Sequence, residues 1–154
     1  MDLYELKVVK DFGKLSTDGY VYFRITNYCG NILYDIRGWR NHGETPFDVG
    51  IKLNAVELVR LYFLLRKAIK ETIPKKPIHT LIKNGTEIKI YNYFGDVTSQ
   101  GITLQFTYTQ WGEYGYKYDL RHWEAGFSDC WDGVRMTDDE CFPYLKFWKK
   151  NFEA

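Results

Sequence analysis

The sequence predicts an α+β fold made of two similar halves, each a four-stranded antiparallel sheet followed by one helix. Three observations support this prediction. A hexapeptide recurs, as YDIRGW at residues 34–39 and as YDLRHW at residues 118–123. An alternation of apolar and polar residues precedes each copy, and a segment with helical periodicity follows each. A repeat spanning about half the chain indicates that one structural unit occurs twice.

The correspondence between the halves extends beyond the hexapeptides, which are 84 residues apart. Phe12–Ser16 matches Phe94–Thr98 at an offset of 82, and Gly50–Asn54 matches Gly133–Thr137 at an offset of 83. Such small changes of offset indicate short insertions in loops. We therefore divide the chain into a first repeat, a linker and a second repeat, at residues 1–73, 74–77 and 78–154.

Period-2 patterns place the strands of each half. Val21, Phe23 and Ile25 alternate with polar or aromatic residues, which is typical of a strand with one buried face. In the second half the equivalent apolar residues are Ile102, Leu104 and Phe106. Each hexapeptide is expected to form the third strand. The segments Gly50–Leu53 and Gly133–Met136 are expected to form short fourth strands.

A capping signal marks the start of the first helix. Asn54 precedes an apolar segment that we expect to be helical over residues 55–71, and Glu57 completes a capping box. The prolines of residues 74–77 then end the helix and predict a semi-rigid linker.

The second helix repeats the capping box with Thr137 and Glu140. Pro143 follows the first turn, so this helix is expected to be kinked or to begin late. The first helix is apolar around more than one face and needs a partner beyond its own sheet. We expect the second repeat to supply this partner, so that a single monomeric chain forms an intramolecular pseudo-dimer. The second helix would make the contact through Phe142, Leu145, Trp148 and Phe152.

Composition limits the possible classes of protein. The chain has 154 residues, of which 45% are hydrophobic, enough for one ordinary domain or two small ones. A net charge of +1 argues against binding polyanions by bulk charge, although residues 1–77 carry 13 Lys/Arg against 9 Asp/Glu and residues 78–154 carry 8 against 11.

The chain has no apolar run of transmembrane length and no signal-peptide pattern, so we expect a cytoplasmic protein without membrane contact.

The strand pattern also predicts what faces away from the helices. If Ile36 and Leu120 face the helices, the Asp, Arg and Trp of each hexapeptide lie on the opposite face and are expected to be exposed. Cations beside aromatic rings suit single-stranded nucleic acid, because bases stack on rings and cations follow the backbone. The alternative is that these residues are cross-strand packing partners. The predicted binding residues are Tyr22, Arg24, Tyr28, Arg37, Trp39, Lys52, Trp111, Arg121, Trp123 and Arg135.

The order of these motifs resembles a known family. Phe-Gly-x-Leu-Ser, a long strand, Tyr-Asp-Ile-Arg-x-Trp, Gly-Ile-x-Leu and a helix are similar to the transcriptional positive cofactor four family of single-stranded DNA-binding proteins, especially its short bacterial members. The resemblance covers residues 4–72 well and 88–152 more weakly. It implies curved four-stranded sheets with a C-terminal helix and a bacterial or phage-like source.

The resemblance also implies a function, which is sequence-tolerant binding of single-stranded DNA, or of RNA, in transcription, replication or repair. Arg37 and Arg121 match the family's DNA-contacting arginine of the third strand. Tyr28 and Trp111 match the aromatic residue that ends its second strand, and the tryptophans match the aromatic residue that follows the arginine.

Two other classes of function are alternatives to nucleic-acid binding. An enzyme is not expected, because the histidines are dispersed and no motif for a nucleophile, a phosphate loop or a metal is present. Three cysteines without metal-ligand spacing are expected to be buried or half-buried thiols, and no cofactor is expected. The stronger rival is a protein-interaction module, in which Phe47, Phe127 and Trp131 would present an apolar patch.

Overall fold

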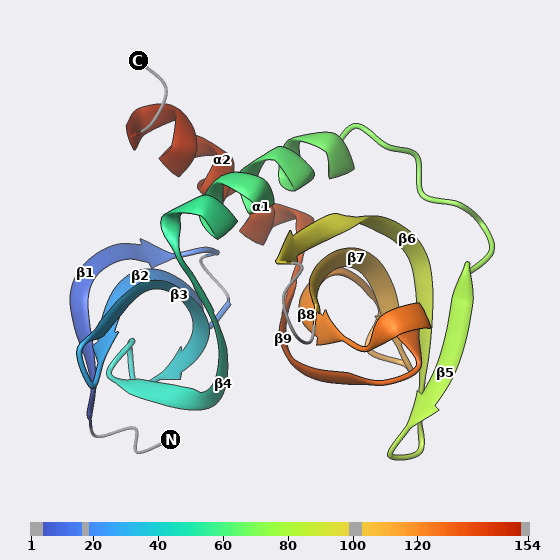
Figure 1. Cartoon of the computed structure of the whole chain (residues 1–154), viewed down its shortest axis with the longest axis horizontal. Helices are drawn as coiled ribbons and strands as arrows, with labels where there is room; N and C mark the ends of the chain where they lie inside the picture. The colour runs from blue at the N-terminus through green and yellow to red at the C-terminus, as the bar shows by residue number, and fades with distance from the viewer. Residues whose placement is uncertain (1–4, 17–18, 99–102, 152–154) are drawn as a thin grey trace.

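The computed structural model contains two antiparallel β-sheets with few helices, which confirms the α+β class (Figure 1). It describes residues 5–16, 19–98 and 103–151, apart from the side chains of residues 142–145, 148 and 151.

The first sheet has the strand order β1-β2-β3-β4 and precedes helix α1. Its elements are β1 (Leu6–Lys14), β2 (Val21–Tyr28), β3 (Asn31–Arg40), β4 (Thr45–Leu53) and α1 (Ala55–Ala68). The fourth strand is longer than expected, because it begins at Thr45 rather than at Gly50. The capping box of Asn54 and Glu57 is confirmed, and the helix ends three residues before the expected boundary at Glu71.

The second sheet has five strands, in the order β5-β6-β7-β8-β9, so the expectation of four is wrong. Its elements are β5 (His79–Lys83), β6 (Thr86–Thr98), β7 (Thr103–Trp111), β8 (Tyr116–Trp123), the short 3₁₀ helix η2 (Ala125–Phe127), β9 (Cys130–Met136) and α2 (Asp138–Asn151). The added strand β5 forms a hairpin with β6. Asn84 and Gly85 make its turn with positive φ angles of 50° and 79°, which fits an Asn-Gly hairpin turn.

Helix α2 begins directly after its predicted cap. Thr137 and Glu140 form the expected capping box, with the backbone N–H of Thr137 donating to Glu140 and the backbone N–H of Glu140 donating to the Thr137 hydroxyl. The helix starts at Asp138 and extends past Pro143, so of the two expected alternatives, a kink or a late start, the late start is wrong.

One hydrophobic core joins both sheets to α1. It includes Phe23 and Ile36 of the first sheet, Phe106 and Leu120 of the second, and Leu61 of the helix, each no more than 2% exposed. The predicted second partner of α1 is therefore present, and it includes β6 as well as α2. The residues expected to carry the helix contact (Phe142, Leu145, Trp148 and Phe152) have side chains outside the described part of the structure.

α1 approaches β6 closely at a glycine. A Cβ atom added to Gly95 would lie 2.6 Å from a methyl carbon of Leu64, so a side chain at this position would force Leu64 to move. The guanidinium of Arg60 also donates a 3.2 Å hydrogen bond to the carbonyl of Val97.

Each sheet is strongly curled, and the helices lie outside both curls (Figure 1). Because the core residues pack on the helix side, the opposite face of each sheet lines the inside of its curl. Among the described residues, no helix has the length and apolar character needed to cross a membrane.

Candidate functional site

Arg37 of β3 lies inside the first curl and is held by groups of its own sheet. Its Nε donates to a carboxylate oxygen of Asp35 at 3.1 Å, and Nη1 donates to the carbonyls of Phe47 and Asp48 at 2.7 and 2.9 Å. The hydroxyl of Thr26 donates to the other oxygen of Asp35 at 2.9 Å. The expectation that Arg37 is exposed is wrong, because it is 1% exposed. The curl of the sheet, which strand alternation does not reveal, encloses this face.

The same arrangement occurs inside the second curl. Arg121 donates from Nε to Asp119 at 3.0 Å and from Nη1 to the carbonyl of Trp131 at 2.8 Å. Asp119 also accepts hydrogen bonds from Thr109 and from the indole of Trp111, both at 3.1 Å. The Arg121 side chain is 13% exposed, so it reaches solvent more than Arg37 does. Asp35 and Asp119 therefore act as the counter-ions of Arg37 and Arg121.

A glycine opposite each arginine explains why the hexapeptide and the Gly-Ile-like segment recur together. Gly50 pairs with Arg37 across β3 and β4, and Gly133 pairs with Arg121 across β8 and β9. A Cβ atom at Gly50 would lie 2.6 Å from the guanidinium carbon of Arg37, and one at Gly133 would lie 2.7 Å from that of Arg121. Each arginine therefore packs flat over a backbone that has no side chain.

Arg24 of β2 is also buried and paired. Its guanidinium lies 4.3 Å from the ring centre of Tyr22 and 4.5 Å from that of Trp39, which is close enough for cation–π contact. It donates to the carbonyl of Gly43 at 2.7 Å and to Asp11 at 2.9 Å. The hydrogen bond from Arg24 holds the pKa of Asp11 below its usual value of 3.8.

The two tryptophans of the hexapeptides are enclosed. Trp39 is 4% exposed and covered by Arg24, whereas Trp123 is 1% exposed and packs edge-on against Phe127. The expectation that Arg24, Trp39 and Trp123 are exposed is therefore wrong. These rings are packing surfaces, and they fill the interiors of the curls.

The remaining predicted residues are half-buried. Lys52 lies 4.6 Å from the ring centre of Tyr28, and Tyr22 lies against Arg24. Trp111 lies 4.4 Å from the guanidinium of Arg121 and 5.8 Å from that of Arg135.

Arg135 of β9 donates to the carbonyls of Thr109 and Gly115, at 3.1 and 3.0 Å, and burial lowers the pKa of its guanidinium. The side chain is 16% exposed. It therefore remains a partly accessible cation at the edge of the second curl.

A groove lies where the two sheets meet, near the neighbouring strands β4 and β9. It consists of two cavities of about 590 and 320 Å³ that share Tyr20, Val21, Lys117 and Arg135 in their walls. Both volumes fall within the range of small-ligand sites. Three aromatic residues, three cations and two carboxylates line the groove: Tyr20, Phe47, Tyr114, Lys117, Arg121, Arg135, Asp139 and Glu140.

The groove contains only two of the ten predicted binding residues, Arg121 and Arg135. Sequence reasoning missed Tyr20 and Tyr114, which are 58% and 77% exposed and precede strands rather than belonging to a repeated motif. It also missed Lys117, one residue before the second hexapeptide. Strand alternation could have found Lys117, because it shares a face of β8 with Asp119 and Arg121.

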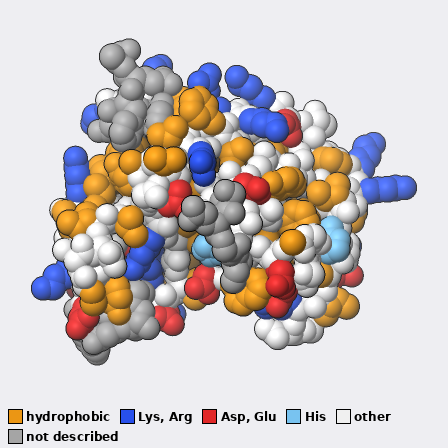
Figure 2. Space-filling model, in the orientation of Figure 1, with side chains coloured by type: hydrophobic (Ala, Val, Ile, Leu, Met, Phe, Trp, Pro, Cys, Tyr) orange, Lys and Arg blue, Asp and Glu red, His pale blue; other side chains and the backbone are white. Residues whose placement is uncertain are grey.

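Charge is not concentrated on the face shown in Figure 2, where basic side chains are spread around the outline and acidic ones lie between them. Within the described residues, no group of three or more His, Cys, Asp or Glu side chains could hold a metal ion. What distinguishes the groove is therefore the combination of exposed rings with a few cations.

The fold and site thus define an α+β protein with two curled sheets and, between them, a groove lined by aromatic rings and by charged side chains of both signs. Comparisons with protein-family models, with curated proteins and with solved structures found no match to this chain.

Proposed function

We propose that the protein binds single-stranded nucleic acid, in the groove between its two sheets. The observation that carries this proposal is the presence of exposed aromatic rings beside cations in one groove, with Tyr20 and Tyr114 as stacking surfaces and Lys117 as a phosphate contact. Base stacking contributes about 1–3 kcal/mol per base and depends little on sequence. Such a site requires no large net charge, in agreement with the value of +1.

The two halves form an intramolecular pseudo-dimer in this proposal. The recurrence of the Asp35–Arg37 pair as Asp119–Arg121, each over a glycine of the next strand, supports a common origin of the two sheets. In such a pseudo-dimer the groove lies between the repeats. Its walls are unlike each other, because Tyr20 and Phe47 come from the first repeat whereas Lys117 and Arg135 come from the second.

The test is a titration of a fluorescently labelled, mixed-sequence DNA 12-mer with the protein at low salt, followed by fluorescence anisotropy. Lys117→Ala is expected to weaken binding severalfold, because it removes a cation from the groove wall. The matched control is Lys89→Ala, which removes a lysine of β6 outside the groove. An RNA 12-mer of the same sequence measures the preference between DNA and RNA. Absence of a complex at low salt would refute the proposal.

A protein-interaction module is the second candidate function. It is favoured by the internal pairing of Arg24 and Arg37, which leaves the inside of the first curl occupied by its own side chains. In that case the groove would receive a peptide. Binding of DNA that is unaffected by Lys117→Ala, or no binding at all, would favour this second candidate.

A further inference from the structure

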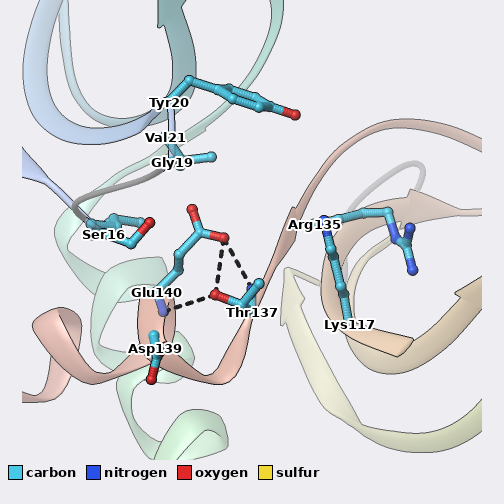
Figure 3. A pocket seen from close by; sticks show the side chains of 10 residues that line it. Ser16, Gly19, Tyr20, Val21, Lys117, Arg135, Thr137, Asp139 and Glu140 are labelled. Atoms are coloured by element: carbon cyan, nitrogen blue, oxygen red, sulfur yellow. Dashed lines mark hydrogen bonds between the residues drawn. The ribbon is translucent and has the colours of Figure 1, made fainter. Parts of the chain in front are cut away.

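The larger cavity of the groove contains a carboxylate oxygen that is held in place and has no hydrogen-bond donor among the described residues. Glu140 is 6% exposed. Its Oε1 accepts hydrogen bonds from the backbone N–H of Thr137 at 3.1 Å and from the Thr137 hydroxyl at 3.2 Å. The capping box thus fixes the orientation of the carboxylate. Figure 3 shows the second oxygen, Oε2, pointing away from Thr137 towards Gly19.

Gly19 lies close to this oxygen, and its lack of a side chain prevents a clash there. A Cβ atom at Gly19 would lie 3.0 Å from Oε2 of Glu140 and 2.4 Å from the hydroxyl oxygen of Ser16. Tyr20, the next residue, places its exposed ring on the wall of the same cavity, and Lys117 stands on the other side (Figure 3). Arg135 also lines the cavity, but its guanidinium points away from Glu140 and donates to the carbonyls of Thr109 and Gly115 (Figure 3). A ring-stacking surface, an acceptor and a lysine therefore line one cavity.

We infer that Oε2 of Glu140 accepts a hydrogen bond from the exocyclic amino group of a nucleobase, so that the groove prefers cytosine or adenine to thymine or uracil. This inference rests on the proposed function. A base stacked on Tyr20 would turn its edge towards the cavity, while Lys117 contacts its phosphate. Carboxylates accept from the amino group of cytosine, and thymine has a carbonyl oxygen at the same ring position. A carbonyl facing a nearly buried carboxylate leaves both groups without a donor.

The experiment compares labelled dC12 with dT12, which are equal in length, charge and ring size, at pH 7.5 by fluorescence anisotropy. The expected result is that dC12 binds at least about tenfold more tightly than dT12, because thymine cannot make the hydrogen bond to the charged carboxylate. Equal affinities, or tighter binding of dT12, would overturn the inference and leave the proposed function intact. If neither oligomer binds and the mixed-sequence 12-mer does not bind either, both are overturned.

Glu140→Gln assigns the preference to this oxygen. Glutamine also serves at this position of a capping box, so the helix start is kept. Its amide oxygen would take the place of Oε1, because Thr137 donates there, and its NH₂ group would take the place of Oε2. The acceptor then becomes a donor, and the preference for dC12 is expected to disappear or to reverse.

Two further variants complete the test. Glu57→Gln makes the same change in the capping box of α1, outside the groove, and is expected to keep the preference. Gly19→Ala places a methyl group beside Oε2 while keeping the Glu140 carboxylate and the Thr137 hydroxyl that form the cap, and is expected to weaken binding of dC12 more than binding of dT12. Circular dichroism verifies that each variant is folded. A dC12 preference that persists in both Glu140→Gln and Gly19→Ala would overturn the inference.

Discussion

Replacing Asp35 with alanine is expected to destabilise the protein by about 3–5 kcal/mol, the usual cost of removing one partner from a buried ion pair. The side chains of Asp35 and Arg37 are only 1% and 2% exposed, so water cannot solvate the arginine after its counter-ion is lost. The two carbonyls that accept from Nη1 remain and stabilise the charge in part. The Thr26 hydroxyl also loses its acceptor, which adds about 1 kcal/mol.

Urea unfolding followed by circular dichroism measures this change in the free energy of unfolding. For a chain of this size, each kcal/mol lowers Tm by roughly 2–4 °C, so a decrease of about 6–20 °C is expected. Glu87→Ala is the control, because Glu87 pairs with Lys89 on the surface, where their side chains are 52% and 37% exposed. Such an exposed pair contributes no more than about 1 kcal/mol to the free energy of unfolding. A loss for Asp35→Ala no larger than for this control would refute the reasoning. Adding Arg37→Met to Asp35→Ala should recover stability, since the unpaired charge is removed.

Two other predictions follow from buried groups. Gly50→Ala should destabilise the protein by about 1–3 kcal/mol in the same urea assay, because the new methyl group would overlap the guanidinium of Arg37; an unchanged midpoint would contradict this. Of the three thiols, only Cys29 should react rapidly with Ellman's reagent at pH 8 in the native protein, because Cys130 and Cys141 are buried and burial raises the pKa of each thiol. Two or more fast thiols before unfolding would contradict that assignment.

Sequence patterning predicted the elements of the fold because apolar alternation and capping are local signals. Ile36 and Leu120, placed in the core by alternation, are both fully buried. Both capping boxes formed as predicted. Strand β5 was missed although Asn84-Gly85 is a strong hairpin signal, because the repeat had fixed the expected number of strands at four.

The candidate site was predicted less well, because its geometry depends on how far each sheet curls. Alternation correctly placed Arg37 on the face away from the helices, but it contains no information about whether that face is open. Irregular pairing accompanies the curl, with register shifts between Val8 and Lys10 in β1 and between Ile90 and Asn92 in β6. Bulges of this kind increase strand twist and bending. The first half of β4 then supplies the carbonyls of Phe47 and Asp48, which accept from the enclosed arginine.

The internal pairing of the arginines also determines how binding should depend on salt. If Arg24 and Arg37 contacted phosphates, the first sheet would contribute counterion release of its own, but both are no more than 5% exposed and already paired. Phosphate contacts are then limited to the groove cations Lys117, Arg121 and Arg135. Arg121 and Arg135 are also paired with Asp119, but their side chains are 13% and 16% exposed. Three contacts to a single strand give a slope of log K against log [salt] of about −2. A slope near −4 or steeper would mean that the curls open on binding and release their arginines to the nucleic acid. Because opening would break buried ion pairs, that outcome would require each curl to exchange an internal counter-ion for a phosphate.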